Sequence, residues 1–155
     1  MSKIIYEQDD GTVAIIIPNL KEINPETGVE YTIDEIAMKD VPSGLSYDIV
    51  EDSAIPTDRS FRNAWIQSGK TVVEDMPRAK EIHKTNIRLA RTEKFKELDV
   101  DYQKATETSA DTSDIVAKKQ ALRDAPAASG ITTAVTTTEL KQQWDTNILG
   151  TSPYS

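Results

Sequence analysis

Hydrophobic and polar positions alternate in short runs over the first third of the chain, a pattern that predicts β-strands. Two runs rich in β-branched residues, 3–6 and 12–17, flank a polar segment that ends in Asp10-Gly11. An Asp-Gly step suits a hairpin turn because glycine adopts positive φ readily. Pro18 lacks an amide hydrogen and should end the second strand. Weaker alternation over residues 46–50 predicts a third strand.

A short helix is predicted over residues 32–39. The Thr32 side chain can accept a hydrogen bond from the main chain at the helix start, and the Glu35 carboxylate, three residues later, can accept one from the Thr32 amide. This capping box is followed by Pro42-Ser43-Gly44, which should end the helix. A second hairpin is expected around Ser68-Gly69, with Trp65 filling the small core beside it.

The long polar segment after Asp75 predicts one long helix. Asp75 is a suitable N-cap and Pro77 fits the first turn. No glycine or further proline interrupts the segment before about Thr106, which gives roughly 30 residues, or about 45 Å of helix. Its last part carries an apolar stripe with spacings of three and four, made of Phe95, Leu98, Tyr102 and Ala105.

A second helix over about 114–123 follows a polar turn. Its apolar residues Ile115 and Leu122 should pack on the stripe, because two helices joined by a short loop normally lie antiparallel. Pro126 should end this helix. Residues 127–130 are expected to form a flexible link, and a short helix or turn is expected to lead to Trp144. The polar residues 151–155 are expected to fray.

These elements predict an α+β protein, with a small antiparallel β-rich N-terminal part followed by an antiparallel hairpin of one long and one shorter helix. The predicted domains are a β-rich domain over residues 1–74, the helical hairpin over 75–126, and a C-terminal extension with a short helix over 127–155.

Charge is spread unevenly along the 155 residues. The net charge is -8, of which residues 1–60 carry -9 (4 basic and 13 acidic residues) and residues 61–155 carry +1 (14 basic and 13 acidic). An acidic N-terminal part would repel phosphates, which argues against nucleic acid as its partner. The absence of cysteine rules out disulfides and thiolate metal sites. No apolar run is long enough to predict a membrane span, and no secretory signal is evident.

Catalytic chemistry is not indicated by any motif. His83 is the only histidine, no second ligand of that type accompanies it, and we expect it to be a solvated residue on a helix face. There is no Gly-x-Ser-x-Gly sequence and no glycine-rich phosphate loop. We therefore expect a protein that is not an enzyme, with no catalytic, cofactor-binding or metal-binding residues.

One charged pattern requires an explanation. Lys80, Lys84, Arg88 and Arg91 follow one another at spacings of four, four and three, which places them on one face of the long helix. This basic stripe could dock on the acidic N-terminal part, could bind an acidic surface of another protein, or could be a solvated face. Nucleic acid is a weaker alternative because Phe95 is the only aromatic residue nearby.

A second candidate patch is Arg59 and Arg62 beside Phe61. These residues could bind a partner, or they could be ordinary surface residues engaged in cation–π contacts.

The C-terminal half resembles a known family. The sequence contains Arg88-x-x-Arg91, then Leu98-Asp99-Val100-Asp101-Tyr102, then Gln120-Ala121-Leu122-Arg123-Asp124-Ala125-Pro126, and finally Trp144. Over about residues 78–144 this resembles the tail assembly chaperones, or tail fibre assembly proteins, of tailed bacteriophages.

This resemblance implies a phage protein that binds a tail fibre or another tail component during assembly in the host cytoplasm. The alternative is a structural protein retained in the virion, at the tail or the fibre attachment region. Neither nucleic acid nor a membrane is an expected partner. In the implied hairpin, Arg123 pairs with Asp124, Asp99 or Asp101 to fix the register, and Trp144 folds back over the open end as a further partner-binding candidate.

Overall fold

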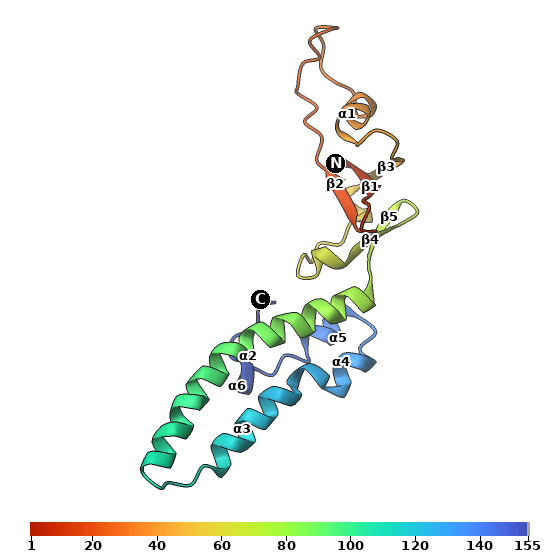
Figure 1. Ribbon diagram of the computed structural model, residues 1–155. Helices are drawn as coiled ribbons and strands as arrows, with labels where there is room; N and C mark the ends of the chain where they lie inside the picture. The colour runs from red at the N-terminus through yellow and green to blue at the C-terminus, as the bar shows by residue number, and fades with distance from the viewer. Residues whose placement is uncertain (155) are drawn as a thin grey trace. The chain divides into compact units, whose positions relative to one another are not determined.

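The computed structural model describes residues 1–154 (Figure 1). The chain divides into two compact units, Met1–Asp75 and Met76–Ser155. The predicted hairpin and C-terminal extension both belong to the second unit, apart from Asp75 at the hairpin's start. Ser155, the last residue of the predicted extension, lies outside the described residues. The prediction of an α+β fold with an antiparallel β part before a long helix is confirmed.

The first unit is built on a three-stranded antiparallel sheet. Its strands are β1 (Ser2–Glu7), β2 (Val13–Ile16) and β3 (Tyr47–Glu51), in the order β2-β1-β3. The predicted hairpin joins β1 to β2, with the Gln8 amide donating to the Thr12 carbonyl over 2.8 Å. Gly11 has a φ of 74°, a value that glycine adopts without a steric penalty.

Two hydrophobic cores lie on opposite faces of this sheet. Adjacent residues of β1 contribute to different cores because successive side chains of a strand point to opposite faces. Ile4 packs with Ile36 and Ala37 of α1 (Ile33–Asp40), whose predicted capping box between Thr32 and Glu35 is present. Ile5 packs on the opposite face.

That second core lies beneath the predicted second hairpin, β4 (Trp65–Ser68) and β5 (Thr71–Glu74). Trp65, 1% exposed, fills it as predicted. Two short 3-10 helices, η1 (Asp52–Ala54) and η2 (Arg62–Ala64), lie between β3 and β4.

The second unit contains the predicted helical hairpin. Helix α2 (Met76–Glu107) and helix α3 (Ser113–Asp124) lie side by side, joined by a short turn (Figure 1). The ion pair between the two helices differs from the one predicted. Lys119 Nζ lies 2.6 Å from Asp99 Oδ1, whereas the Arg123 guanidinium donates to the Gln120 side chain on its own helix.

The core of this unit lies towards the start of α2. The buried residues of α2 are Ala79, His83 and Ile87, which follow one another at spacings of four. By contrast, Tyr102 in the predicted stripe is 39% exposed. Leu122 of α3 is buried, as predicted. The buried residues of the hairpin therefore lie near its open end, where α2 begins and α3 ends.

Short helices cover that open end. They are η3 (Ala125–Ala127), α4 (Ser129–Thr133), α5 (Thr137–Lys141) and α6 (Thr146–Leu149), and they contribute buried Ile131, Leu140 and Leu149. The prediction of a flexible link over 127–130 is wrong, because Ser129 and Gly130 begin α4. Gly130 packs so closely on the Gln143 side chain that a Cβ there would collide with it.

Candidate functional site

The basic stripe lies on α2 as predicted, but its residues have different roles. Lys80 Nζ donates to the Thr132 carbonyl over 2.6 Å, which ties α2 to α4. Lys84 Nζ forms an ion pair of 2.8 Å with Glu81 one turn earlier. Both ammonium groups therefore have partners within their own unit.

Arg91 connects the two helices of the hairpin. Its Nη1 donates to the carbonyls of Leu122 and Arg123, each over 3.2 Å. These carbonyls belong to the last turn of α3, where main-chain acceptors have no partner within the helix. The guanidinium also lies 5.9 Å from the centre of the Phe95 ring. Arg91 thus caps α3 and holds it against α2.

Arg88 is the exposed member of the stripe. Among residues 1–154 its guanidinium has no ion-pair partner. It lines a surface hollow of about 520 Å³, which we call the basic hollow. The residues that line it are Lys84, Arg88, Arg91, Arg123, Pro126, Ala127 and Thr132. None of them is acidic, so the charge of the hollow is positive.

Arg123 is the residue of this hollow that sequence reasoning assigned to another role. We expected it to pair with an aspartate and fix the hairpin register. Instead it adds a cation from α3 to those that α2 supplies, and its Nη1 donates to the neutral side chain of Gln120. The spacing of Gln120 and Arg123, three residues along one helix, is the signal that could have indicated their contact.

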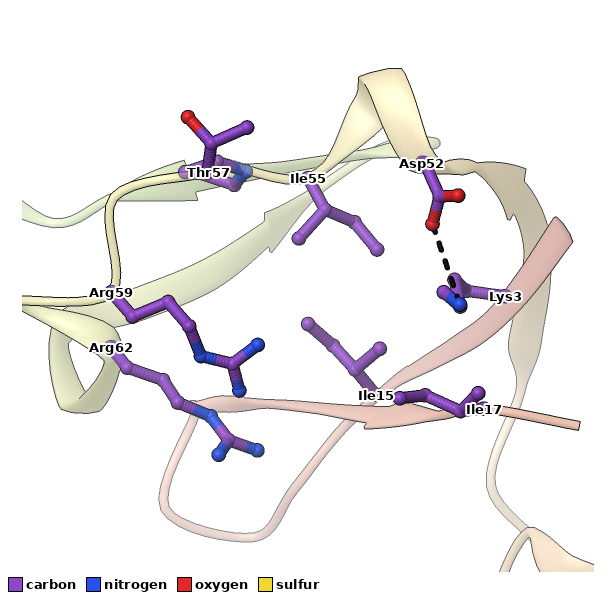
Figure 2. Close-up of a pocket in the computed structure, with 9 residues that line it drawn as sticks. Lys3, Ile15, Ile17, Asp52, Ile55, Thr57, Arg59 and Arg62 are labelled. Carbon is purple, nitrogen blue, oxygen red and sulfur yellow. Dashed lines mark ion pairs between the residues drawn. The ribbon is translucent and has the colours of Figure 1, made fainter. Parts of the chain in front are cut away.

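The second patch, in the first unit, also faces a hollow. Figure 2 shows the guanidinium groups of Arg59 and Arg62 pointing into it, with Ile15 and Ile55 between them and the ion pair of Lys3 and Asp52. That ion pair spans 3.4 Å, and the hollow has a volume of about 330 Å³.

Phe61 does not share this surface, because its side chain is 1% exposed and belongs to the core. Arg59 lies 5.8 Å from the centre of the Trp65 ring, a cation–π contact of the kind considered from the sequence.

The expectation that His83 is solvated is wrong. Its side chain is fully buried, and Nδ1 lies 2.7 Å from the Tyr154 hydroxyl. The two rings stack at 5.5 Å, and the Trp144 ring meets both edge-on. Trp144 is itself buried, with Nε1 donating to the Gly150 carbonyl over 3.0 Å. The expected fraying of the tail is also wrong as far as Tyr154.

Burial determines the charge of His83. An imidazolium would lose its hydration here, so the pKa of His83 falls from 6.5 to about 4 and the ring is neutral at pH 7. Its Nε2 is buried with no hydrogen-bond partner in the described part of the chain. Both ring nitrogens are thus enclosed, and the histidine contributes to packing between α2 and the C-terminal segment.

The described residues provide neither a metal site of carboxylates and histidines nor a membrane-spanning helix. Residues 1–154 contain no cluster of three or more histidine and carboxylate side chains that could hold a metal ion. Within that range no helix combines the length and apolar character needed to cross a membrane. Comparison of the chain with protein-family models, with curated proteins and with solved structures gave no match.

Proposed function

We propose that this protein is a non-enzymatic phage tail-associated protein that binds a tail fibre or another tail component during assembly, through the basic hollow. The observation that carries the proposal is the gathering of four cations, Lys84, Arg88, Arg91 and Arg123, around one hollow with no acidic side chain in its lining.

The segments that resemble tail assembly proteins support this choice of surface. Arg88 and Arg91 come from the first of those segments, and Arg123 and Pro126 come from the Gln-Ala-Leu-Arg-Asp-x-Pro segment more than thirty residues later. All four line the basic hollow. Trp144, the last residue of the resemblance, is buried in the same unit.

The chemistry of the hollow favours a carboxylate-bearing partner. A guanidinium offers several N–H donors in a planar fork that matches a carboxylate. Among the described residues no carboxylate lies within ion-pair distance of the Arg88 guanidinium, although Glu81 interacts with it electrostatically. An acidic segment of a tail protein would supply that anion and would be attracted from a distance by the positive charge. The chain's net charge of -8 disfavours nucleic acid as the partner.

The proposal is tested by purifying the affinity-tagged full chain from infected cells and identifying the accompanying proteins by mass spectrometry. A tail fibre or another tail component, recovered in a fixed ratio, is the expected result. Recovery of no tail component, in lysates where tail proteins are abundant, would contradict the proposal.

The copy number in purified particles separates the two forms of this function. A chaperone is lost from the particle or is strongly substoichiometric, whereas a structural component has a fixed copy number relative to a known tail protein. Either result is compatible with tail association. The copy number shows whether the protein leaves its partner before the particle is complete or stays in it.

A further inference from the structure

The outer edge of β2 is an unpaired strand edge. Strand β2 lies at one side of the sheet and pairs only with β1 among residues 1–154. Unpaired edges present main-chain donors and acceptors that can bind another strand.

The register determines which groups face outwards. Ile5 lies opposite Ile15 and Tyr6 opposite Ala14, and the pair beyond the strand ends, Gln8 and Thr12, is hydrogen-bonded. Hydrogen-bonded and non-hydrogen-bonded pairs alternate along an antiparallel ladder. Ala14 and Ile16 therefore bond to β1, while the amides and carbonyls of Val13 and Ile15 point away from it.

Two hollows adjoin β2, one beside residues 12–15 and the other over the sheet face next to it. The hollow of Figure 2 lies over the sheet face, because its lining includes Lys3 of β1 and Asp52 after β3 as well as Ile15 and Ile17. A neighbouring hollow of about 580 Å³ is lined by Gln8, Asp10, residues 12–15, Arg62 and Asn63. Arg62 and Ile15 line both hollows, so the two are neighbours. Ile17, just past the strand, is 67% exposed. We call this combined surface the β2 groove.

The β2 groove has a small excess of positive charge, with Lys3, Arg59 and Arg62 against Asp10 and Asp52. Lys3 is neutralised by Asp52, but the guanidinium groups of Arg59 and Arg62 have no ion-pair partner among residues 1–154. They face the aliphatic side chains of Ile15 and Ile55 (Figure 2). An occupant that fits therefore has main-chain hydrogen-bonding groups, aliphatic side chains and carboxylates.

We propose that the β2 groove binds an extended acidic segment of a partner protein, which adds a strand beside β2 and pairs carboxylates with Arg59 and Arg62. Main-chain bonds to Val13 and Ile15 hold the segment, and its aliphatic side chains contact Ile15, Ile17 and Ile55. A second copy of β2 fits less well because residues 12–17 contain no acidic side chain. This surface is separate from the basic hollow and does not depend on the proposed function.

The test uses the full chain, labelled with ¹⁵N, and the seven-residue peptide Val-Thr-Glu-Thr-Val-Thr-Glu, whose valine and glutamate side chains share one face of an extended strand. In the free protein, the Val13 and Ile15 amides should exchange with solvent at least about ten times faster than those of Ala14 and Ile16. The peptide should slow exchange of the Val13 and Ile15 amides by about five-fold or more. Exchange of the Ala14 and Ile16 amides should be nearly unchanged. The peptide Val-Thr-Lys-Thr-Val-Thr-Lys is the matched control and should not bind.

The double variant R59Q/R62Q should weaken the peptide's affinity by about five-fold or more, since it removes both charge-assisted contacts. The variant K21Q/K70Q, which removes two exposed cations elsewhere in the same unit, should bind normally. If loss of the Arg59 contact with Trp65 prevents folding, I17E tests the same groove, because Ile17 is exposed and a glutamate there competes for the arginines.

Three results would overturn the proposal. The first is unchanged exchange at Val13 and Ile15 with millimolar peptide, and the second is equal binding of the lysine peptide. The third is protection of Val13 and Ile15 without peptide in a concentration-dependent dimer, which would assign the groove to a second copy of the chain. Each of these results is independent of whether tail components bind the basic hollow.

Discussion

The hydroxyl of Tyr154 lies 2.7 Å from Nδ1 of His83, a residue 71 positions earlier in the chain. The Asn86 side chain donates to the same hydroxyl over 3.2 Å. The Tyr154 hydroxyl can therefore accept from Asn86 and donate to a neutral His83. This arrangement joins the last residues of the C-terminal unit to the first half of α2.

The stability of the unit should depend on pH through His83. Its pKa is about 4 in the folded chain and 6.5 when exposed, so the unfolded chain binds the proton more readily between these values. The free energy of unfolding should therefore be highest above about pH 6.5 and should fall as the pH drops towards 4. The two pKa values set an upper limit of about 3 kcal/mol to this loss.

The His83→Gln variant isolates this contribution, because glutamine cannot titrate and its amide can still reach Tyr154. Urea unfolding measured at several pH values should give a flatter profile for the variant between pH 7 and pH 5. Carboxylates with lowered pKa values, such as Glu81, act in both proteins and cancel in the comparison. Parallel profiles would show that His83 is not buried as described.

Arg91 and Arg88 should differ sharply when each is replaced by glutamine. Arg91→Gln leaves the carbonyls of Leu122 and Arg123 without their donor and should destabilise the chain by about 1 to 3 kcal/mol. Arg88→Gln removes an exposed side chain and should change stability by less than about 0.5 kcal/mol. Chemical denaturation of the two variants makes the comparison, and equal effects would exclude a capping role for Arg91.

Leu122 should contribute strongly to the packing of the hairpin. It is 2% exposed on α3, so Leu122→Ala should cost about 2 to 5 kcal/mol in the free energy of unfolding. Val116 lies on the same helix but is 47% exposed, and Val116→Ala should cost less than about 1 kcal/mol. A small effect at Leu122 in thermal or urea unfolding would mean that α3 does not pack on α2 as described.

Local signals in the sequence were sufficient to predict these helices and the hairpin turn. The capping box of Thr32 and Glu35 lies within one helical turn, and the Asp10-Gly11 step specifies its own turn. The long helix was predictable because nothing between Pro77 and Glu107 interrupts it. Each of these features depends only on residues close together in the chain.

Contacts between distant residues could not be predicted in the same way. His83 fits the spacing of four that joins Ala79 and Ile87, a signal that it is buried, but its polarity favoured a solvated position. Its burial depends on Trp144 and Tyr154, which no local pattern connects to α2. Likewise, Arg91 reaches across the hairpin to α3, so its spacing within the stripe did not reveal its role as a cap.

The basic hollow is tested most directly by the variant Lys84→Gln, Arg88→Gln, Arg123→Gln, which leaves the capping residue Arg91 in place. Its control is Lys96→Gln, Lys104→Gln, Lys118→Gln, which removes three exposed cations of the same unit outside the hollow. The measurement is the amount of tail component that co-purifies with each tagged protein from infected cells. We expect a loss of about ten-fold or more for the hollow variant and normal recovery for the control. Equal recovery with both variants would contradict the assignment of the hollow as the partner-binding site.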